Sequence, residues 1–107
     1  MTDVAVLVNL LAAGALFAVG LSCLISKAHL VKLVIGVELL GKGASLVFVL
    51  GGYLAGDVGT SQAVVFTLIV IEAVVAAVAL ALVVLVKRTY LTLDASAVAA
   101  KARGGEP

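Results

Sequence analysis

The chain has 107 residues, of which 64% are hydrophobic and 12% are charged, and its formal net charge is +1. A soluble domain carries roughly a quarter of its residues as charges, so this composition indicates a membrane protein. The near-neutral charge and the aromatic content of 5% argue against a nucleic-acid surface. The single cysteine, Cys23, excludes an internal disulfide and a cysteine-based metal site within one chain.

The first predicted element is a transmembrane helix over residues 4–25. This run contains no charged residue and is long enough to cross a hydrocarbon core of about 30 Å. It follows Asp3 rather than a basic region, so we expect a retained span and not a cleaved signal peptide. Gly14 and Ala18 offer a seam of small residues for another helix, or simply reflect how frequent small residues are here.

The second predicted helix covers residues 30–50. It follows a short, tight connection, and Lys27, His29 and Lys32 cluster at this connection and the start of the helix. His29 is expected to be a solvated residue of this connection rather than a ligand, because no metal-binding cluster accompanies it in the sequence.

The third predicted helix covers residues 62–86. A glycine-rich turn precedes it, in which Thr60 or Ser61 is the expected N-cap. The apolar run stops at Lys87 and Arg88.

Residues 1–90 are therefore expected to form one all-α membrane domain with three transmembrane helices. Residues 91–107 have the composition of a solvated, disordered tail. Basic residues cluster at the first connection and after the third span, whereas Asp3 and Asp57 lie at the opposite end. The excess of positive charge in cytoplasmic segments predicts an outside N-terminus and a cytoplasmic C-terminal tail.

Two glutamates, Glu38 and Glu72, fall near mid-membrane depth in antiparallel spans. An ionised side chain at this depth costs at least a few kcal/mol, so acids here rarely face lipid. Desolvation raises the pKa of a carboxyl group, which lets a carboxyl in a membrane exchange protons near neutral pH. The pair predicts a proton-transfer path, and the alternative is that each glutamate only forms a hydrogen bond between helices.

Lys42 stands one helical turn after Glu38, so the two side chains share a face and an ion pair between them is predicted. Lys42 then either neutralises Glu38 for insertion or tunes its protonation and takes part in proton transfer itself, and the sequence leaves both roles open. Gly41 and Ser45 extend the same stripe, which should face protein or water.

Smaller side chains suggest how the helices pack. Ala76 and Ala79 follow Glu72 at helical spacing and predict a face for close packing, or they simply reflect how frequent small residues are here. Asn9 and Thr67 are expected to form hydrogen bonds between helices, and for Thr67 a bond to its own backbone is the commoner outcome.

Two segments carry a resemblance to a known family. Residues 36–40 (GVELL), followed by residues 62–72 (QAVVFTLIVIE), resemble subunit K of respiratory complex I. This family includes the MrpC protein of Mrp-type sodium/proton antiporters and the small membrane subunits of energy-converting hydrogenases. The resemblance implies three helices, an outside N-terminus, and a place for Glu38 and Glu72 in the hydrophilic axis that carries protons.

The resemblance implies a small membrane-arm subunit of a redox-driven proton- or sodium-translocating complex, complex I-like or a membrane-bound hydrogenase. Its partners would be antiporter-like membrane subunits in a bacterial or archaeal plasma membrane, and the chain would hold no cofactor and catalyse nothing alone. The alternative is the MrpC protein of an Mrp-type antiporter without redox activity. Complex I relatives usually have asparagines around Lys42 and Ser45, and residues 62–71 look closer to the antiporter protein, which generally lacks the glutamate corresponding to Glu72. The chain combines features of both, so both hosts stay open.

Other membrane proteins with an essential carboxylate fit less well. Small multidrug exporters and rotor subunits have even numbers of spans, whereas three are predicted here. A purely structural subunit remains an alternative.

Overall fold

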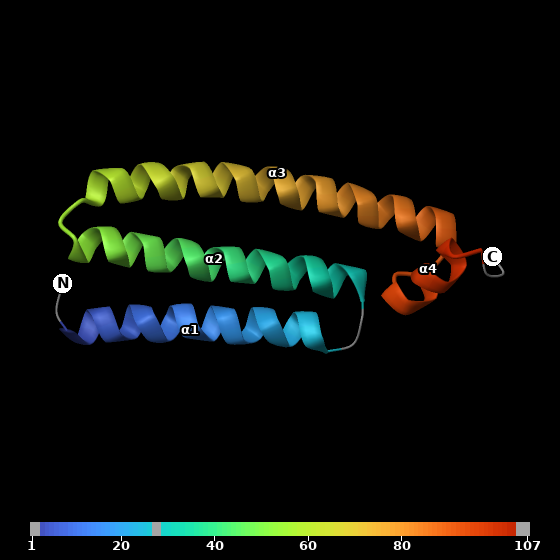
Figure 1. Cartoon of the computed structure of the whole chain (residues 1–107), viewed down its shortest axis with the longest axis horizontal. Coiled ribbons are helices and arrows are strands. Elements are labelled where there is room, and N and C mark those ends of the chain that lie inside the picture. Colours follow the sequence, from blue (N-terminus) through green and yellow to red (C-terminus); the bar gives the residue numbers. More distant parts are fainter. Residues whose placement is uncertain (1–2, 27–28, 105–107) are drawn as a thin grey trace.

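Three long helices lie side by side in the computed structural model, which describes residues 3–26 and 29–104. They are α1 (Asp3–Ile25), α2 (Leu30–Leu54) and α3 (Val58–Tyr90), with α2 between the other two (Figure 1). Each is long and apolar enough to span a membrane. The predicted all-α fold with three transmembrane helices is confirmed. Lys27, assigned to the first connection, lies outside the described residues.

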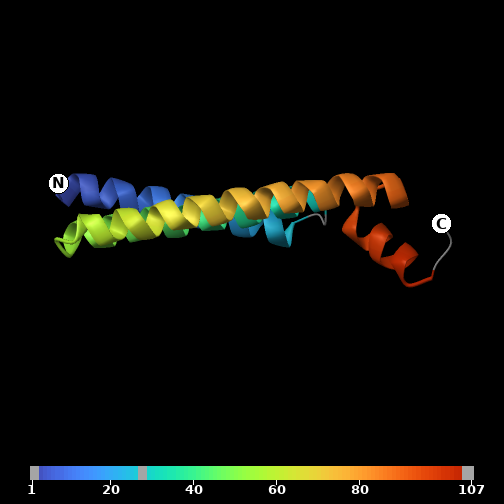
Figure 2. The same cartoon turned by 90° about the horizontal axis from the view of Figure 1, so that it is seen from above.

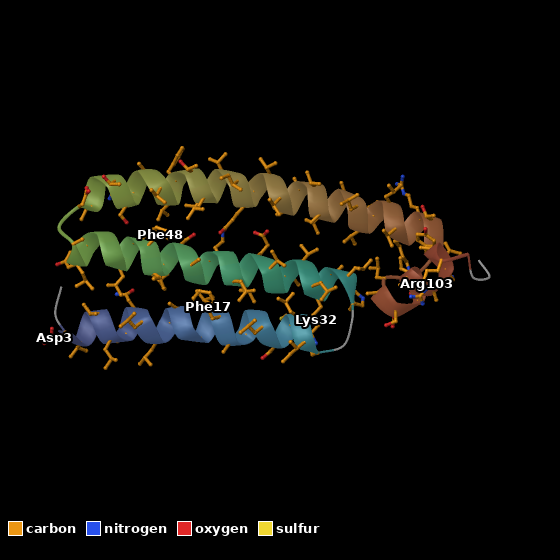
Figure 3. The ribbon with its side chains drawn as sticks, viewed as in Figure 1. Asp3, Phe17, Lys32, Phe48 and Arg103 are labelled. Carbon is orange, nitrogen blue, oxygen red and sulfur yellow. The ribbon has the colours of Figure 1, made fainter. Side chains whose placement is uncertain are left out.

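Helices α1 and α2 pack through positions that lack a side chain. A Cβ atom on Gly36 would lie 2.9 Å from the carbonyl oxygen of Gly20, and one on Gly20 would lie 3.0 Å from that of Gly36. Further along, Phe17 extends from α1 towards α2, and its ring would lie 3.2 Å from a Cβ on Gly43 (Figure 3). Close backbone approach is needed because lipid provides no hydrophobic force between helices.

The seam predicted at Gly14 and Ala18 is not used inside this chain. Both residues are exposed, and a Cβ on Gly14 would have nothing within 4 Å. The buried small residues of α1 are Ala13 and Gly20 instead. Because α1 is apolar on every side, its sequence does not indicate which side another helix covers.

The turn between α2 and α3 is capped by Asp57, so the predicted cap at Thr60 or Ser61 is wrong. The Asp57 carboxylate accepts a hydrogen bond from the backbone N–H of Thr60 at 3.2 Å. Helix α3 therefore begins at Val58, earlier than predicted. The Ser61 hydroxyl lies inside the first turns and donates to the carbonyl of Phe48 at 2.7 Å, which joins α3 to α2.

The helices also extend beyond the predicted spans. Helix α2 continues to Leu54, and α3 continues past Lys87 and Arg88 to Tyr90. With 33 residues, α3 is about 50 Å long and exceeds the hydrocarbon thickness of about 30 Å. Hydrophobicity marks the apolar part of a helix, whereas backbone hydrogen bonding continues into its polar ends.

The segment after α3 returns to the beginning of α2. The backbone N–H of Leu30 donates to the carbonyl of Leu93 at 2.9 Å, and His29 forms an isolated antiparallel bridge with Asp94. The His29 side chain forms no capping hydrogen bond. The first turn of a helix has N–H groups without partners inside the helix, and the returning chain provides an acceptor for one of them.

A short helix, α4 (Ala95–Ala102), follows this return, so the expected disordered tail is wrong for these residues. The Asp94 carboxylate caps it by accepting from the N–H of Ala97 at 3.1 Å. The Lys101 ammonium donates to the carbonyl of Tyr90 at 2.9 Å and so holds α4 near the end of α3. Figure 2 shows α4 turned away from the long helices.

Candidate functional site

A charged hydrogen bond joins α2 to α3 half-way along both helices. The Lys42 Nζ atom lies 2.8 Å from Oε2 of Glu72, the one ion pair found within residues 3–26 and 29–104. Lys42 is the central residue of α2, and Glu72 lies two residues before the centre of α3. This is the depth at which lipid offers no hydrogen-bonding partner to a charged group.

Gly41 makes the space for this ion pair. A Cβ atom there would lie 2.9 Å from the carboxyl carbon of Glu72 and closer still to its Oε1. The Glu72 side chain is 15% exposed, while that of Lys42 is 53% exposed. The carboxylate therefore lies between the helices, and the ammonium reaches it from the outer side. One turn later, buried Ser45 donates to the Gly41 carbonyl at 3.0 Å.

Glu38 lies next to this pair without forming an ion pair in the described part of the chain. It is partly exposed and lines a shallow groove between α2 and α3, which also includes Ala79. It is close enough to Lys42 for their charges to interact. The predicted Lys42–Glu38 ion pair is therefore wrong. Without a side chain at Gly41, the carboxylate of α3 comes within reach of Lys42, and the lysine bonds across the interface.

The weakly polar residues form local hydrogen bonds. The Thr67 hydroxyl donates to the Ala63 carbonyl of its own helix at 3.0 Å, which is the commoner outcome expected for threonine. The Asn9 amide donates to the Ala5 carbonyl at 2.9 Å, also within its helix. Across the described residues, no group of three histidine, cysteine or acidic side chains lies together as a metal site would require.

The sequence therefore identified the ionisable residues but not their pairing. Gly41 carried a signal that was available, because a glycine inside a polar helical stripe leaves room for a side chain from elsewhere. Sequence reasoning placed Gly41 in the stripe and did not assign it this role.

Three long apolar helices with ionisable groups half-way along two of them define a multi-pass membrane protein. Residues 8–101 match the family model of NADH-ubiquinone/plastoquinone oxidoreductase chain 4L, and the chain belongs to this family. The family consists of small membrane subunits of complex I-like complexes, which confirms the family resemblance of the sequence. Comparison with curated proteins gave no match.

Proposed function

We propose that this chain supplies Glu38, Glu72 and Lys42 to a lateral proton-transfer path in a redox-driven, ion-translocating membrane complex. The observation that carries the proposal is the Lys42–Glu72 hydrogen bond of 2.8 Å with Glu38 beside it. Ionisable groups are unfavourable at this depth, and three together in one helix interface point to a function rather than to packing.

Charge balance gives these residues a proton-exchanging role. The group contains two carboxyls and one ammonium, so it is neutral when it holds one proton between the carboxyls. Glu72 bonds to Lys42, whereas Glu38 forms no ion pair within the described residues. Loss of that proton leaves a net negative charge in low-dielectric surroundings, which favours uptake of another.

The proposal assigns the chain a passive part in catalysis. It holds no redox cofactor and catalyses no reaction alone, and the energy comes from partner subunits. The hosts it fits are a complex I-like enzyme or a membrane-bound hydrogenase of a bacterial or archaeal plasma membrane, in which the chain packs beside antiporter-like subunits. The ion carried is a proton or sodium.

The distribution of charge supports an outside N-terminus and a cytoplasmic C-terminus. Asp3 lies at one end of the long helices, and Lys32 and Arg103 lie near the other (Figure 3). Lys87 and Arg88 in the last turn of α3 add to the basic end. Basic segments stay preferentially in the cytoplasm.

A second candidate is the MrpC protein of an Mrp-type antiporter. It is favoured by residues 62–71, which resemble the antiporter protein, although that protein generally lacks the glutamate corresponding to Glu72. Complex I relatives usually have asparagines around Lys42 and Ser45. Purification of the native complex distinguishes the two. Partner chains with iron–sulfur or hydrogenase motifs support the redox complex, whereas antiporter subunits alone support ion exchange.

The test of the proton path is Glu72→Gln in the native complex. Glutamine keeps the size and a hydrogen-bond acceptor but cannot release a proton, so assembly is expected to stay intact while proton pumping falls. Thr67→Val on the same helix is the control, because Thr67 bonds only to its own backbone among the contacts found. Full pumping by Glu72→Gln removes Glu72 from the path. Wild-type turnover in the Glu38→Gln and Glu72→Gln double variant supports a structural role instead.

A further inference from the structure

Lys42 has hydrogen-bonding capacity that the described part of this chain does not use. An ammonium has three N–H donors, and its one acceptor here is Glu72. The Lys42 side chain remains 53% exposed despite this bond. Donors left without acceptors in the hydrocarbon layer cost several kcal/mol each, so the exposed side of Lys42 needs a polar neighbour.

Water at the membrane surface is too far away to be that neighbour. Twelve residues of α2 separate Lys42 from either end of the helix, which is about 18 Å along the axis. A lysine side chain extends only several Å, so it reaches the interface only from near a helix end. The acceptor must therefore lie at the same depth as Lys42.

The exposed strip around Lys42 has the form of a helix-packing surface. Ile35, Lys42 and Val49 lie seven residues apart and are 48%, 53% and 44% exposed. Tyr53 follows one turn after Val49 and is 42% exposed. Residues at this spacing return to one side of a helix, as in packed helix pairs. We call these four residues the Lys42 face.

The Lys42 face is hollowed and partly polar towards one end. Val49 and Tyr53 line a depression together with Asn9 of α1 and Gln62 of α3, so all three long helices contribute to it. This surface has the Lys42 cation at its middle and amide and hydroxyl groups beside the hollow. A protein helix therefore fits it better than acyl chains do.

A second copy of this chain is a poor occupant of the Lys42 face. Two copies with the same membrane orientation are related by an axis along the membrane normal, so identical residues meet at the same depth. Contact through this face would bring Lys42 against Lys42. Two ammonium groups repel strongly in a low-dielectric environment.

We propose that the Lys42 face binds a membrane helix of a different protein in the complex, and that this helix presents a carboxylate or another hydrogen-bond acceptor to Lys42. The proposal rests on the role of the chain as one part of a larger complex and adds the location and the chemistry of one contact.

Photo-crosslinking in native membranes tests the contact. Val49 is replaced by benzoylphenylalanine, and Val74 is the control position because it is 58% exposed at the middle of α3. Each is combined with native Lys42, Lys42→Met or Lys42→Arg. The chain is purified after irradiation, and adducts are mapped to individual residues. The amount of chain in the membrane is measured for every variant.

The expected adduct at Val49 maps to a membrane helix of another protein, and this helix has an acceptor side chain within one turn of the depth of Lys42. Lys42→Met lowers its yield about tenfold because a charged contact is lost, whereas Lys42→Arg retains it and the yield at Val74 stays the same. If the Lys42→Met chain fails to accumulate in the membrane, the proposal is judged by Lys42→Arg. The adduct should form in that variant, and its absence would count against the proposal.

Four results overturn the proposal: an adduct with a second copy, an adduct with lipid alone, a partner helix without an acceptor, or an unchanged yield in Lys42→Met. Pumping by Glu72→Gln, measured in the same membranes, tests the proton path separately. If the adduct maps as expected and Glu72→Gln still pumps fully, the proposed interface is retained and the proton path is rejected.

Discussion

Substitution of Gly41 by alanine should separate Glu72 from Lys42 while leaving the fold in place. The added Cβ would lie 2.9 Å from the Glu72 carboxyl carbon, and ordinary contact begins at 3.4 Å, so this carbon must move by about 0.5 Å. The nearer Oε1 atom must move further. The hydrogen bond of 2.8 Å is then stretched towards or beyond the usual limit of about 3.2 Å.

The effect on stability is expected to be small. A hydrogen bond to a charged group contributes about 1.5–3 kcal/mol, and the exposure of Lys42 favours the lower end. Replacing glycine by alanine inside a helix returns about 0.5–1 kcal/mol. The Glu72 carboxylate is also the end of a flexible side chain and moves more easily than backbone does. As long as the bond lengthens without leaving either charged group unpaired, the net loss is about 1 kcal/mol or less, which is insufficient to prevent assembly.

Proton pumping and electron transfer are measured together in membrane vesicles that contain the native complex. Gly41→Ala should reproduce the pumping loss of Glu72→Gln with normal amounts of assembled complex. Gly51→Ala is the matched control on the same helix, because a Cβ there meets nothing within 4 Å. The reasoning is refuted if Gly41→Ala pumps normally, or if Gly51→Ala loses pumping to the same extent.

Three further outcomes follow from the packing. Gly36→Ala should destabilise the α1–α2 pair by about 1–3 kcal/mol through overpacking, whereas Gly14→Ala should not. Both are measured by denaturant unfolding of the purified chain in detergent, and equal effects would contradict the assigned interface. Asp57→Ala should lower the stability of α3 by about 0.5–2 kcal/mol in the same assay, and an unchanged midpoint would argue against capping. Truncation after Thr92 should accelerate hydrogen exchange of the Leu30 amide, which loses its acceptor; unchanged protection there would show that the return of the chain is not needed.

Residues on the same helix were easier to relate from the sequence than residues on different helices. Helical spacing correctly placed Glu38, Gly41 and Lys42 along neighbouring turns of one helix. It also favoured the ion pair between Glu38 and Lys42, because an i,i+4 pair is the closest one that a single helix offers. Spacing contains no information about which residue of α3 lies opposite, and the observed partner is Glu72.

The C-terminal tail also has contacts between residues far apart in the chain that the sequence did not predict. Its small and charged residues gave no apolar face to predict, so disorder was expected. The structure contains a helix there because Asp94 caps α4 and Lys101 bonds to the end of α3. The hydrogen bond between Leu30 and Leu93 joins residues far apart in the chain, which local composition does not reveal.

The sequence by itself determined the three spans, since their length and hydrophobicity fix a transfer free energy that depends on composition alone. It also determined that ionisable groups lie within them. Only the tertiary structure decided that Glu72 lies in the space beside Gly41 and that Lys42 extends to it from the outer side of the chain. Such a pairing depends on the register and rotation of two packed helices, and many arrangements of equally apolar helices have the same transfer free energy.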